Sequence, residues 1–285
     1  MAEGRVSPNW LQGLAVRPGE RTQLERRDST QKPPDLKRKE AGPAMAEAVA
    51  DLDRLQYLLY ADASASLLIV LQGLDAAGKD GTIRHVLSGM NPQGVRVTPF
   101  KQPTPDEAAH DFLWRAHRAA PARGEVAIFN RSHYEDVLVV RVHELVPEAV
   151  WRERYDRINE FEALLAANGT RILKFFLHLS PEEQLRRFEK RLQDPARQWK
   201  ISEADYTERA FWNAYTEAYE EAITRTSTRH APWFVIPSDR KWVRNLAVAQ
   251  IISLTLEEMG LKTPPVRVDM ADIRHRYHKA VKAAT

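Results

Sequence analysis

The chain has 285 residues, of which 43% are hydrophobic and 28% charged, a balance typical of a globular protein, and its lack of cysteine excludes disulfides and thiolate metal sites. The apolar run at 67–71 cannot span a membrane and residues 1–10 lack the apolar stretch of a signal peptide, so we expect a cytoplasmic protein without a membrane partner. The net charge is +3, and residues 1–43 account for all of it. The rest of the chain has equal numbers of acidic and basic residues, so no overall positive charge is available to attract nucleic acid.

The predicted elements alternate between strands and helices after a basic N-terminal arm at 1–43 and a leucine-striped helix at 44–60. Strands are predicted at 67–71, 95–100, 125–129, 172–179 and 233–236, and helices at 79–88, 105–118 and 242–259. Strands separated by helices predict an α/β fold of three layers, with a five-stranded parallel sheet and helices on both faces. We expect one domain over 44–262 and a C-terminal tail over 263–285.

The segment directly after the first predicted strand fits the P-loop pattern G-x-x-x-x-G-K. It reads Gly73-Leu74-Asp75-Ala76-Ala77-Gly78-Lys79 and leads into a predicted helix. In such a loop the backbone amides, here including those of Ala76 and Ala77, surround phosphate oxygens, and the lysine bridges phosphates. The alternative is a glycine-rich turn without a ligand, which would need the strand, both glycines and the lysine to coincide by accident.

The loop departs from the usual pattern in its acidic residues. Asp80 stands where Ser or Thr normally ligates Mg²⁺, and Gly81 and Thr82 follow as further phosphate-binding or nucleotide-binding candidates. Asp75 lies inside the loop, where a carboxylate among phosphates is repulsive unless it holds a cation or a proton. We therefore predict Asp75 as a metal ligand; its alternative role is to accept hydrogen bonds from loop amides.

A polar segment, Asn130-Arg131-Ser132-His133-Tyr134-Glu135-Asp136, follows the third predicted strand. Ligands of open α/β sheets bind outside the carboxyl ends of the strands, so this segment should face the P-loop. Arg131 would contact a transferring phosphate. Glu135 and Asp136 are metal-ligand candidates, with capping of the next helix as the alternative, and His133 is expected to be packed rather than catalytic.

Residues 182–212, between the fourth and fifth predicted strands, predict a helical hairpin, which we call the lid. Arg187 and Arg191 form a like-charged i,i+4 pair, which is unfavourable unless an anion or nearby acids offset it. Lys200 follows a break at Asp194-Pro195. An arginine-bearing hairpin at this point suits a lid that closes over phosphates. The alternative is a solvated face, because residues 182–212 hold seven acidic and seven basic side chains.

These segments together resemble the second family of polyphosphate kinases over residues 45–260. The resemblance rests on the residues at 73–81 and 130–137, on Asp194-Pro195 with Trp199-Lys200, and on Arg225-Thr226-Ser227-Thr228 before Ala231-Pro232-Trp233. It implies a P-loop kinase-like fold resembling thymidylate kinase and reversible phosphoryl transfer between inorganic polyphosphate and purine nucleotides (ADP/ATP, AMP, GDP/GTP). It also implies Mg²⁺, with Mn²⁺ as an alternative ion, and a homo-oligomer, either a dimer or a tetramer.

By the same resemblance Asp75 binds metal or activates the attacking phosphate, Lys79 binds phosphate, and Arg131 and the lid arginines contact phosphates. Some relatives carry Asp where this chain has Asn130, and the segment is similar to that of members using both nucleoside mono- and diphosphates. Two alternatives stay open: an ATP-dependent nucleotide kinase, whose loop would end in Lys-Ser or Lys-Thr, and a non-catalytic nucleotide-binding module.

Overall fold

The computed structural model describes residues 5–284, and its sheet has six strands in the order β1-β6-β5-β2-β4-β3. Five of them are parallel: β2 (Ser66–Gln72), β3 (Val95–Pro99), β4 (Val126–Asn130), β5 (Thr170–His178) and β6 (Trp233–Pro237). The sixth, β1 (Ala15–Val16), pairs antiparallel with β6. The prediction of a purely parallel five-stranded sheet is therefore wrong at this edge, because a two-residue strand is too short to leave a periodic pattern.

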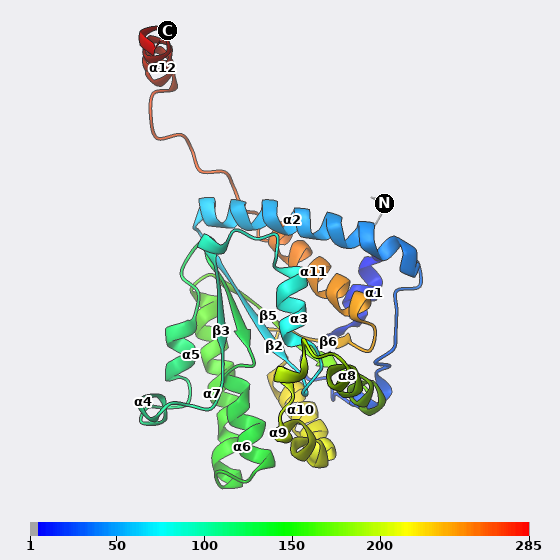
Figure 1. Cartoon of the computed structure of the whole chain (residues 1–285). Coiled ribbons are helices and arrows are strands. Elements are labelled where there is room, and N and C mark those ends of the chain that lie inside the picture. The colour runs from blue at the N-terminus through cyan, green and yellow to red at the C-terminus, as the bar shows by residue number, and fades with distance from the viewer. Residues whose placement is uncertain (1–4, 285) are drawn as a thin grey trace.

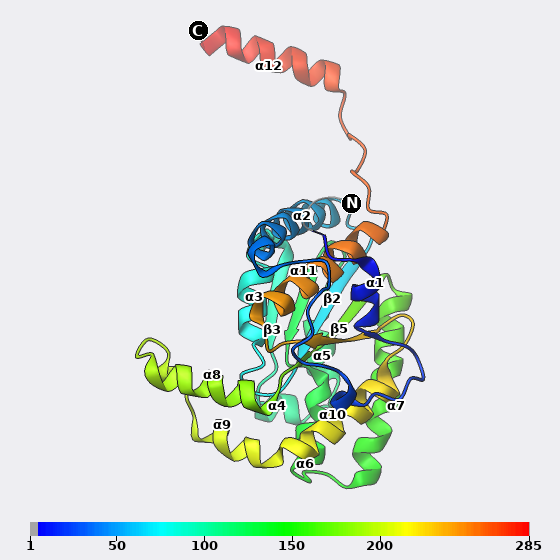
Figure 2. The same cartoon turned by 90° about the vertical axis from the view of Figure 1, so that its right-hand side faces the viewer.

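Helices cover both faces of the sheet, which gives three layers (Figures 1 and 2). Because of this, β2 is buried at every position, as expected for a central parallel strand. Leu67, Ile69 and Leu71 join the core on one face, under α2 (Ala41–Asp62), α3 (Lys79–Val86) and α11 (Lys241–Glu258). Leu68 and Val70 join the core on the other face, under α5 (Trp114–Ala119), α7 (Glu148–Ala167) and α10 (Trp212–Thr226).

The described part of the N-terminal arm packs along the edge of the sheet formed by β6. Residues 1–4 of the predicted arm and residue 285 of the predicted tail lie outside the described residues. The arm contains α1 (Pro8–Gly13) and two short 3-10 turns, η1 (Leu24–Arg26) and η2 (Arg38–Glu40). Leu11 and Leu14 are buried in one core, and Val16 and Leu24 in the other. The arm thereby blocks an edge strand that would otherwise expose its hydrogen-bonding groups.

The helix predicted at 105–118 is in fact two short helices, α4 (Pro105–Ala108) and α5. The chain turns between them because the side chain of Asp111 accepts a hydrogen bond from the amide of Leu113 (2.9 Å), a local contact that competes with a continuous helix. The other short elements outside the lid are η3 (Pro92–Gly94), η4 (His133–Val137) and α6 (Val139–Val142).

The lid forms as a helical hairpin that projects from the body (Figure 2). It comprises α8 (Pro181–Gln193), η5 (Gln198–Lys200), α9 (Glu203–Thr207) and η6 (Glu208–Phe211). At the other end of the molecule the tail carries α12 (Met270–Ala284), which stands away from the body in both views. Among residues 5–284, no helix combines the length and hydropathy needed to cross a bilayer.

Candidate active site

The P-loop connects the carboxyl end of β2 to the first turn of α3. Its backbone is left-handed at Ala76 (φ 62°) and Gly78 (φ 107°). A Cβ atom on Gly78 would lie 1.9 Å from Nη1 of Arg244, so only glycine fits there. The loop wraps around the amino group of Lys79, whose Nζ donates to the carbonyl oxygen of Gly73 (2.6 Å). Burial lowers the pKa of Lys79, and the carboxylate of Asp75 opposes that shift.

Two buried arginines support the P-loop from outside. Arg244, on α11, donates to the carbonyl oxygen of Ala77 (2.9 Å). Arg187, on α8, donates to the carboxylate of Glu183 and to four backbone carbonyls, those of Ala76, Ala77, Ser238 and Asp239. Only 7% of the Arg187 side chain is exposed. The structure therefore corrects the prediction that Arg187 contacts phosphate: its guanidinium already holds the loop backbone.

Two further predicted phosphate ligands, Thr82 and Ala77, have different surroundings. Thr82 is 1% exposed on α3, and its buried hydroxyl has no hydrogen-bond partner among the described residues. The amide of Ala77 donates to the carbonyl oxygen of Leu74 (3.0 Å), so it is used inside the turn. The amides that open the first turn of α3, those of Gly78, Lys79 and Asp80, have no intrahelical acceptor and keep the geometry of an anion site.

The segment after β4 faces the P-loop, as the position of the strand end predicts. Arg131 has a left-handed backbone (φ 60°), held by its own amide, which donates to the carbonyl oxygen of Leu71 (3.0 Å). This unusual conformation turns the guanidinium toward the loop, where Nη2 donates to Oδ1 of Asp75 (3.2 Å). Asn130 donates from Nδ2 to Oδ1 of Asp80 (2.9 Å).

The two acids of this segment point to different places. Glu135 accepts a hydrogen bond from Gln72 (3.0 Å), and burial raises its pKa while Arg131 opposes that shift. Asp136 instead pairs with Arg154 (3.1 Å) and Arg115 (3.7 Å) on the far side of the segment. The structure thus corrects the prediction of Asp136 as a metal ligand, because two guanidinium groups occupy its carboxylate.

The two carboxylates that remain as candidate metal ligands, those of Asp75 and Glu135, could bind a cation together with the phosphate oxygens of the substrate. Asp75 and Glu135 both line the cleft beside the P-loop. Among the residues that the structure describes, no group of three or more His, Cys, Asp or Glu side chains is placed to hold a metal ion alone. Mg²⁺ prefers this arrangement, since it is usually bound by one or two carboxylates together with phosphate oxygens and water.

A buried polar network anchors the segment after β4 from behind. Lys174 on β5 pairs with Glu162 on α7 (2.6 Å), and both contact the hydroxyl of Tyr134 (2.9 Å each). His133 is fully buried beside Glu162 (3.5 Å), and burial lowers its pKa. His133 is thus packed in the core, as its sequence context predicts, and the network fixes the backbone from which Arg131 projects.

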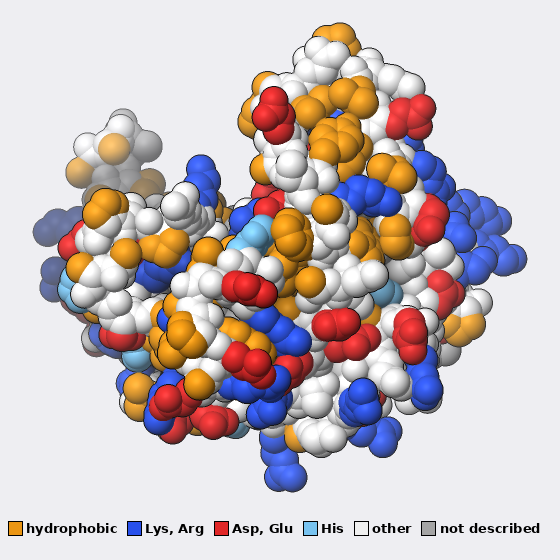
Figure 3. Space-filling model, turned by 90° about the horizontal axis from the view of Figure 1, so that it is seen from below, with side chains coloured by type: hydrophobic (Ala, Val, Ile, Leu, Met, Phe, Trp, Pro, Cys, Tyr) orange, Lys and Arg blue, Asp and Glu red, His pale blue; other side chains and the backbone are white. Residues whose placement is uncertain are grey.

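The lid and α10 close the other side of a cleft of about 320 Å³. Figure 3 looks onto the molecule from this side, where acidic and basic side chains border a hollow. Gln184 on α8 donates to the backbone carbonyl of Asp75 (2.9 Å). Lys200 reaches Asp80 across the opening (3.9 Å). Arg191 lies within the lid beside Asp205 (3.6 Å), so it contributes to the hairpin itself.

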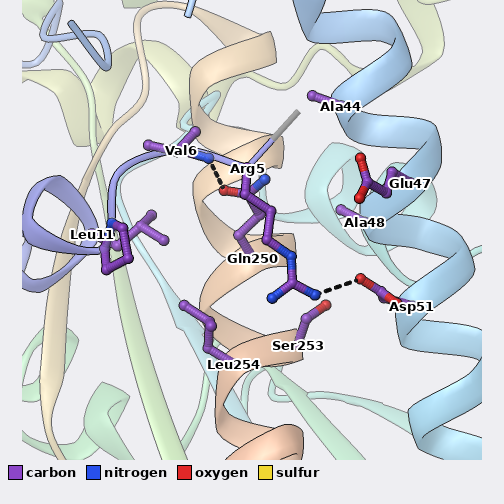
Figure 4. A pocket seen from close by; sticks show the side chains of 11 residues that line it. Arg5, Val6, Leu11, Ala44, Glu47, Ala48, Asp51, Gln250, Ser253 and Leu254 are labelled. Carbon is purple, nitrogen blue, oxygen red and sulfur yellow. Dashed lines mark hydrogen bonds and ion pairs between the residues drawn. The ribbon is translucent and has the colours of Figure 1, made fainter. Parts of the chain in front are cut away.

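Several cleft residues were not predicted from the sequence. Three aromatic residues of α10 line the cleft: Trp212, Tyr215 and Tyr219. Their spacing of three and four residues places them on one face of a helix, and this pattern is visible in the sequence. Gln72 and Arg244, which support the site from outside the cleft, gave no such signal, because their contacts come from segments distant in sequence. A second hollow of about 160 Å³ lies between the arm, α2 and α11 and contains no P-loop residue (Figure 4).

A mainly parallel α/β sheet that ends in a P-loop, with a lysine, a facing arginine and an arginine-bearing lid, defines a P-loop phosphotransferase. Comparison with known proteins narrows this class. The chain matches the family described as Polyphosphate kinase 2 (PPK2) over residues 35–264. It therefore belongs to the polyphosphate kinase 2 family and is an enzyme.

Relatives and a solved structure agree with this membership. The chain is 51% identical to an AMP/ADP-polyphosphate phosphotransferase of Meiothermus ruber, over 87% of this chain and 94% of that protein. It is 46% identical to an ADP-polyphosphate phosphotransferase of Rhodopseudomonas palustris, over 81% and 86%. A crystal structure of Polyphosphate Kinase 2 from Arthrobacter aurescens TC1 superposes with a TM-score of 0.94 at 38% identity, covering 98% of this chain and all of that one.

Proposed function

We propose that this enzyme transfers phosphoryl groups reversibly between inorganic polyphosphate and purine nucleotides, converting nucleoside diphosphates to triphosphates and monophosphates to diphosphates. The observation that carries the proposal is the convergence of Lys79, Asp75 and Arg131 at one end of the cleft. The names of the Meiothermus and Rhodopseudomonas relatives support the substrate pair. We place the enzyme in the cytoplasm as a dimer or tetramer.

In the forward reaction, a terminal phosphate oxygen of the nucleotide attacks the terminal phosphorus of polyphosphate. The bond from that phosphorus to its bridging oxygen breaks, and the shortened polyphosphate leaves with the bonding electrons. The protein positions the reactants and offsets negative charge on the transferring group. Lys79 and the amides at the start of α3 bind one side of that group, and Arg131 binds the other.

Asp75 and Glu135 would hold Mg²⁺, or Mn²⁺ in its place, together with phosphate oxygens; when bound, the ion offsets phosphate charge. In the protein alone Asp75 pairs with Arg131 (3.2 Å). This pairing keeps the guanidinium near the loop and directed toward the cleft. Asp75 thus orients Arg131 in addition to serving as a ligand.

Use of both mono- and diphosphate acceptors is supported by the name of the Meiothermus relative, an AMP/ADP-polyphosphate phosphotransferase, and in part by the neutral Asn130. An aspartate at this position would add a negative charge close to Asp80, whereas the amide of Asn130 donates to Asp80 (2.9 Å). A site with less fixed negative charge tolerates the more anionic diphosphate, while Arg131 still binds a monophosphate. The test is chromatography of separate AMP and ADP incubations with polyphosphate and Mg²⁺. Product from ADP alone, even at high enzyme concentration, would leave a diphosphate kinase.

The rival functions are separated by one incubation without ATP. Pure protein, ADP, polyphosphate and Mg²⁺ should yield ATP. An ordinary nucleotide kinase with ATP as donor would yield none from polyphosphate, and a binding module would turn over neither donor. A Lys79→Ala variant run in parallel removes the contribution of contaminating kinases.

A further inference from the structure

The C-terminal helix α12 exposes an apolar stripe. Every described residue from 262 to 284 is exposed. Met270 (44% exposed), Ile273 (42%) and Tyr277 (64%) lie three and four residues apart, so they share one face of the helix. Single exposed apolar residues are ordinary, but a contiguous stripe marks a contact surface. An isolated helix of 15 residues is also marginal in water, so α12 requires a covering partner.

The tail leaves the body beside the C-terminal end of α2. The amide of Lys262 donates to the carboxylate of Asp62 at the C-terminal end of α2 (2.5 Å). Pro264 and Pro265 then favour a stiff, extended backbone, which carries α12 away from its own chain (Figures 1 and 2). The Arthrobacter structure matches 98% of the chain, so the match extends into these last 25 residues.

The outer face of α2 is exposed and opposite in charge to α12. Ala46, Ala50 and Tyr57 are exposed along one side of α2, with Asp53 beside them. By sequence, α2 holds four acidic side chains and one basic, whereas α12 holds four basic and one acidic. Arg5 neutralises one of the acids, Asp51 (3.0 Å), and a negative excess remains on α2.

We propose that α12 docks on the exposed face of α2 in a second copy of this chain, so that two chains exchange their C-terminal helices. Exchange of identical elements is a common route to two-fold dimers. The exit point supports it, because the tail starts at the end of α2 and points outward. Two chains related by a two-fold axis near this point each present an uncovered α2 face to the other's α12.

Disulfide trapping tests the exchange directly, because the chain contains no cysteine. Two single-cysteine proteins with tags of different mass, Ala50→Cys and Tyr277→Cys, are mixed and mildly oxidised. We expect a disulfide between the two tagged chains, formed at least about tenfold faster than with Lys279→Cys, which lies on the opposite face of α12. The double variant Ala50→Cys/Tyr277→Cys forming only an intrachain link would overturn the exchange, as would no link at all.

Light scattering supplies the second measurement. Ile273→Asp/Tyr277→Asp should reduce the mass of the full-length assembly, whereas Lys279→Ala should leave it unchanged. All three substitutions lie on the exposed helix α12, so circular dichroism should show at most the loss of that helix in the double variant and no change in Lys279→Ala. An unchanged mass for the double variant would overturn the proposal. So would a monomeric native chain that sediments with phosphatidylserine vesicles, because α12 would then be a membrane-surface helix.

Discussion

Replacing Arg187 with methionine removes a guanidinium but retains most of the side-chain volume. The native side chain is buried, and its donors contact one carboxylate and four backbone carbonyls. Removing one partner from a buried charged pair typically costs about 3–5 kcal/mol. After the substitution, the carbonyl of Ala77 still accepts a hydrogen bond from Arg244. Burial and the positive charge of Arg187 both lower the pKa of Arg244, so loss of that charge favours the protonated form of Arg244.

We therefore expect the free energy of unfolding to fall by about 3–5 kcal/mol, rather than by the sum of every lost hydrogen bond. That is a large part of the total stability of about 5–15 kcal/mol usual for a domain. The P-loop backbone should also relax, because the carbonyls of Ala76 and Ala77 lose a fixed donor. We expect turnover to drop by about one to two orders of magnitude, or about 1.4–2.7 kcal/mol of transition-state stabilisation.

Urea unfolding, followed by tryptophan fluorescence, measures the first effect. Arg186→Met is the matched control, because Arg186 contacts the same Glu183 (3.1 Å) but its side chain is 62% exposed. This control should lose less than about 0.5 kcal/mol. Kinetics at a temperature where both variants are folded measures the second effect.

Two results would refute this reasoning. If Arg187→Met and Arg186→Met unfold at the same urea concentration, the buried contacts of Arg187 do not support the fold. If stability is unchanged and only the KM for polyphosphate rises, the guanidinium contacts phosphate, as the sequence alone suggested.

Three further predictions concern the site and the core. Lys79→Ala should lower phosphotransfer at least about 100-fold with an unchanged circular dichroism spectrum, and near-normal turnover would remove the P-loop from the mechanism. Asp75→Asn should be nearly as damaging and should not recover at saturating Mg²⁺; full recovery would leave Asp75 only as a ligand. Burial raises the pKa of Glu162, but the positive charge of Lys174 and the hydrogen bonds to this carboxylate together have a larger effect, so the pKa of Glu162 in the folded protein is lowered. The ionised carboxylate therefore stabilises the fold at a pH above its unfolded pKa of about 4.3, and this stabilisation is lost in acid. Glu162→Gln should thus cost about 3–5 kcal/mol in urea unfolding at pH 7 and less at pH 4, and an equal loss at both would contradict this account.

The parts of the site that could be predicted from the sequence are those set by local pattern. The buried run before Gly73 marks a central strand, and the helix after Lys79 follows from the same few residues. The place of Arg131 follows from topology, because parallel strands end at the same edge of a sheet. These inferences need no knowledge of which side chains meet.

The parts that could not be predicted depend on partners far along the chain. Arg187 was expected to contact phosphate from the lid, but it donates to the backbone carbonyls of Ala76 and Ser238, which no periodicity reveals. Asp136 sits in a segment of ligand-like residues, yet its partner Arg154 comes from α7. In both cases a charged side chain contacts a partner that is distant in sequence, and composition does not predict that the side chain is buried there.

The N-terminal arm has a consequence for the order of folding. Its contacts lie at the opposite end of the sequence: the carbonyl of Val16 accepts from Ser227, 211 residues away, and the amide of Val6 donates to Gln250, 244 residues away. At about 5–20 residues per second, the ribosome needs roughly 10–50 seconds to supply those partners. The arm is therefore made first and docked last, and its apolar residues, Leu11 and Leu24 among them, stay available to chaperones throughout synthesis.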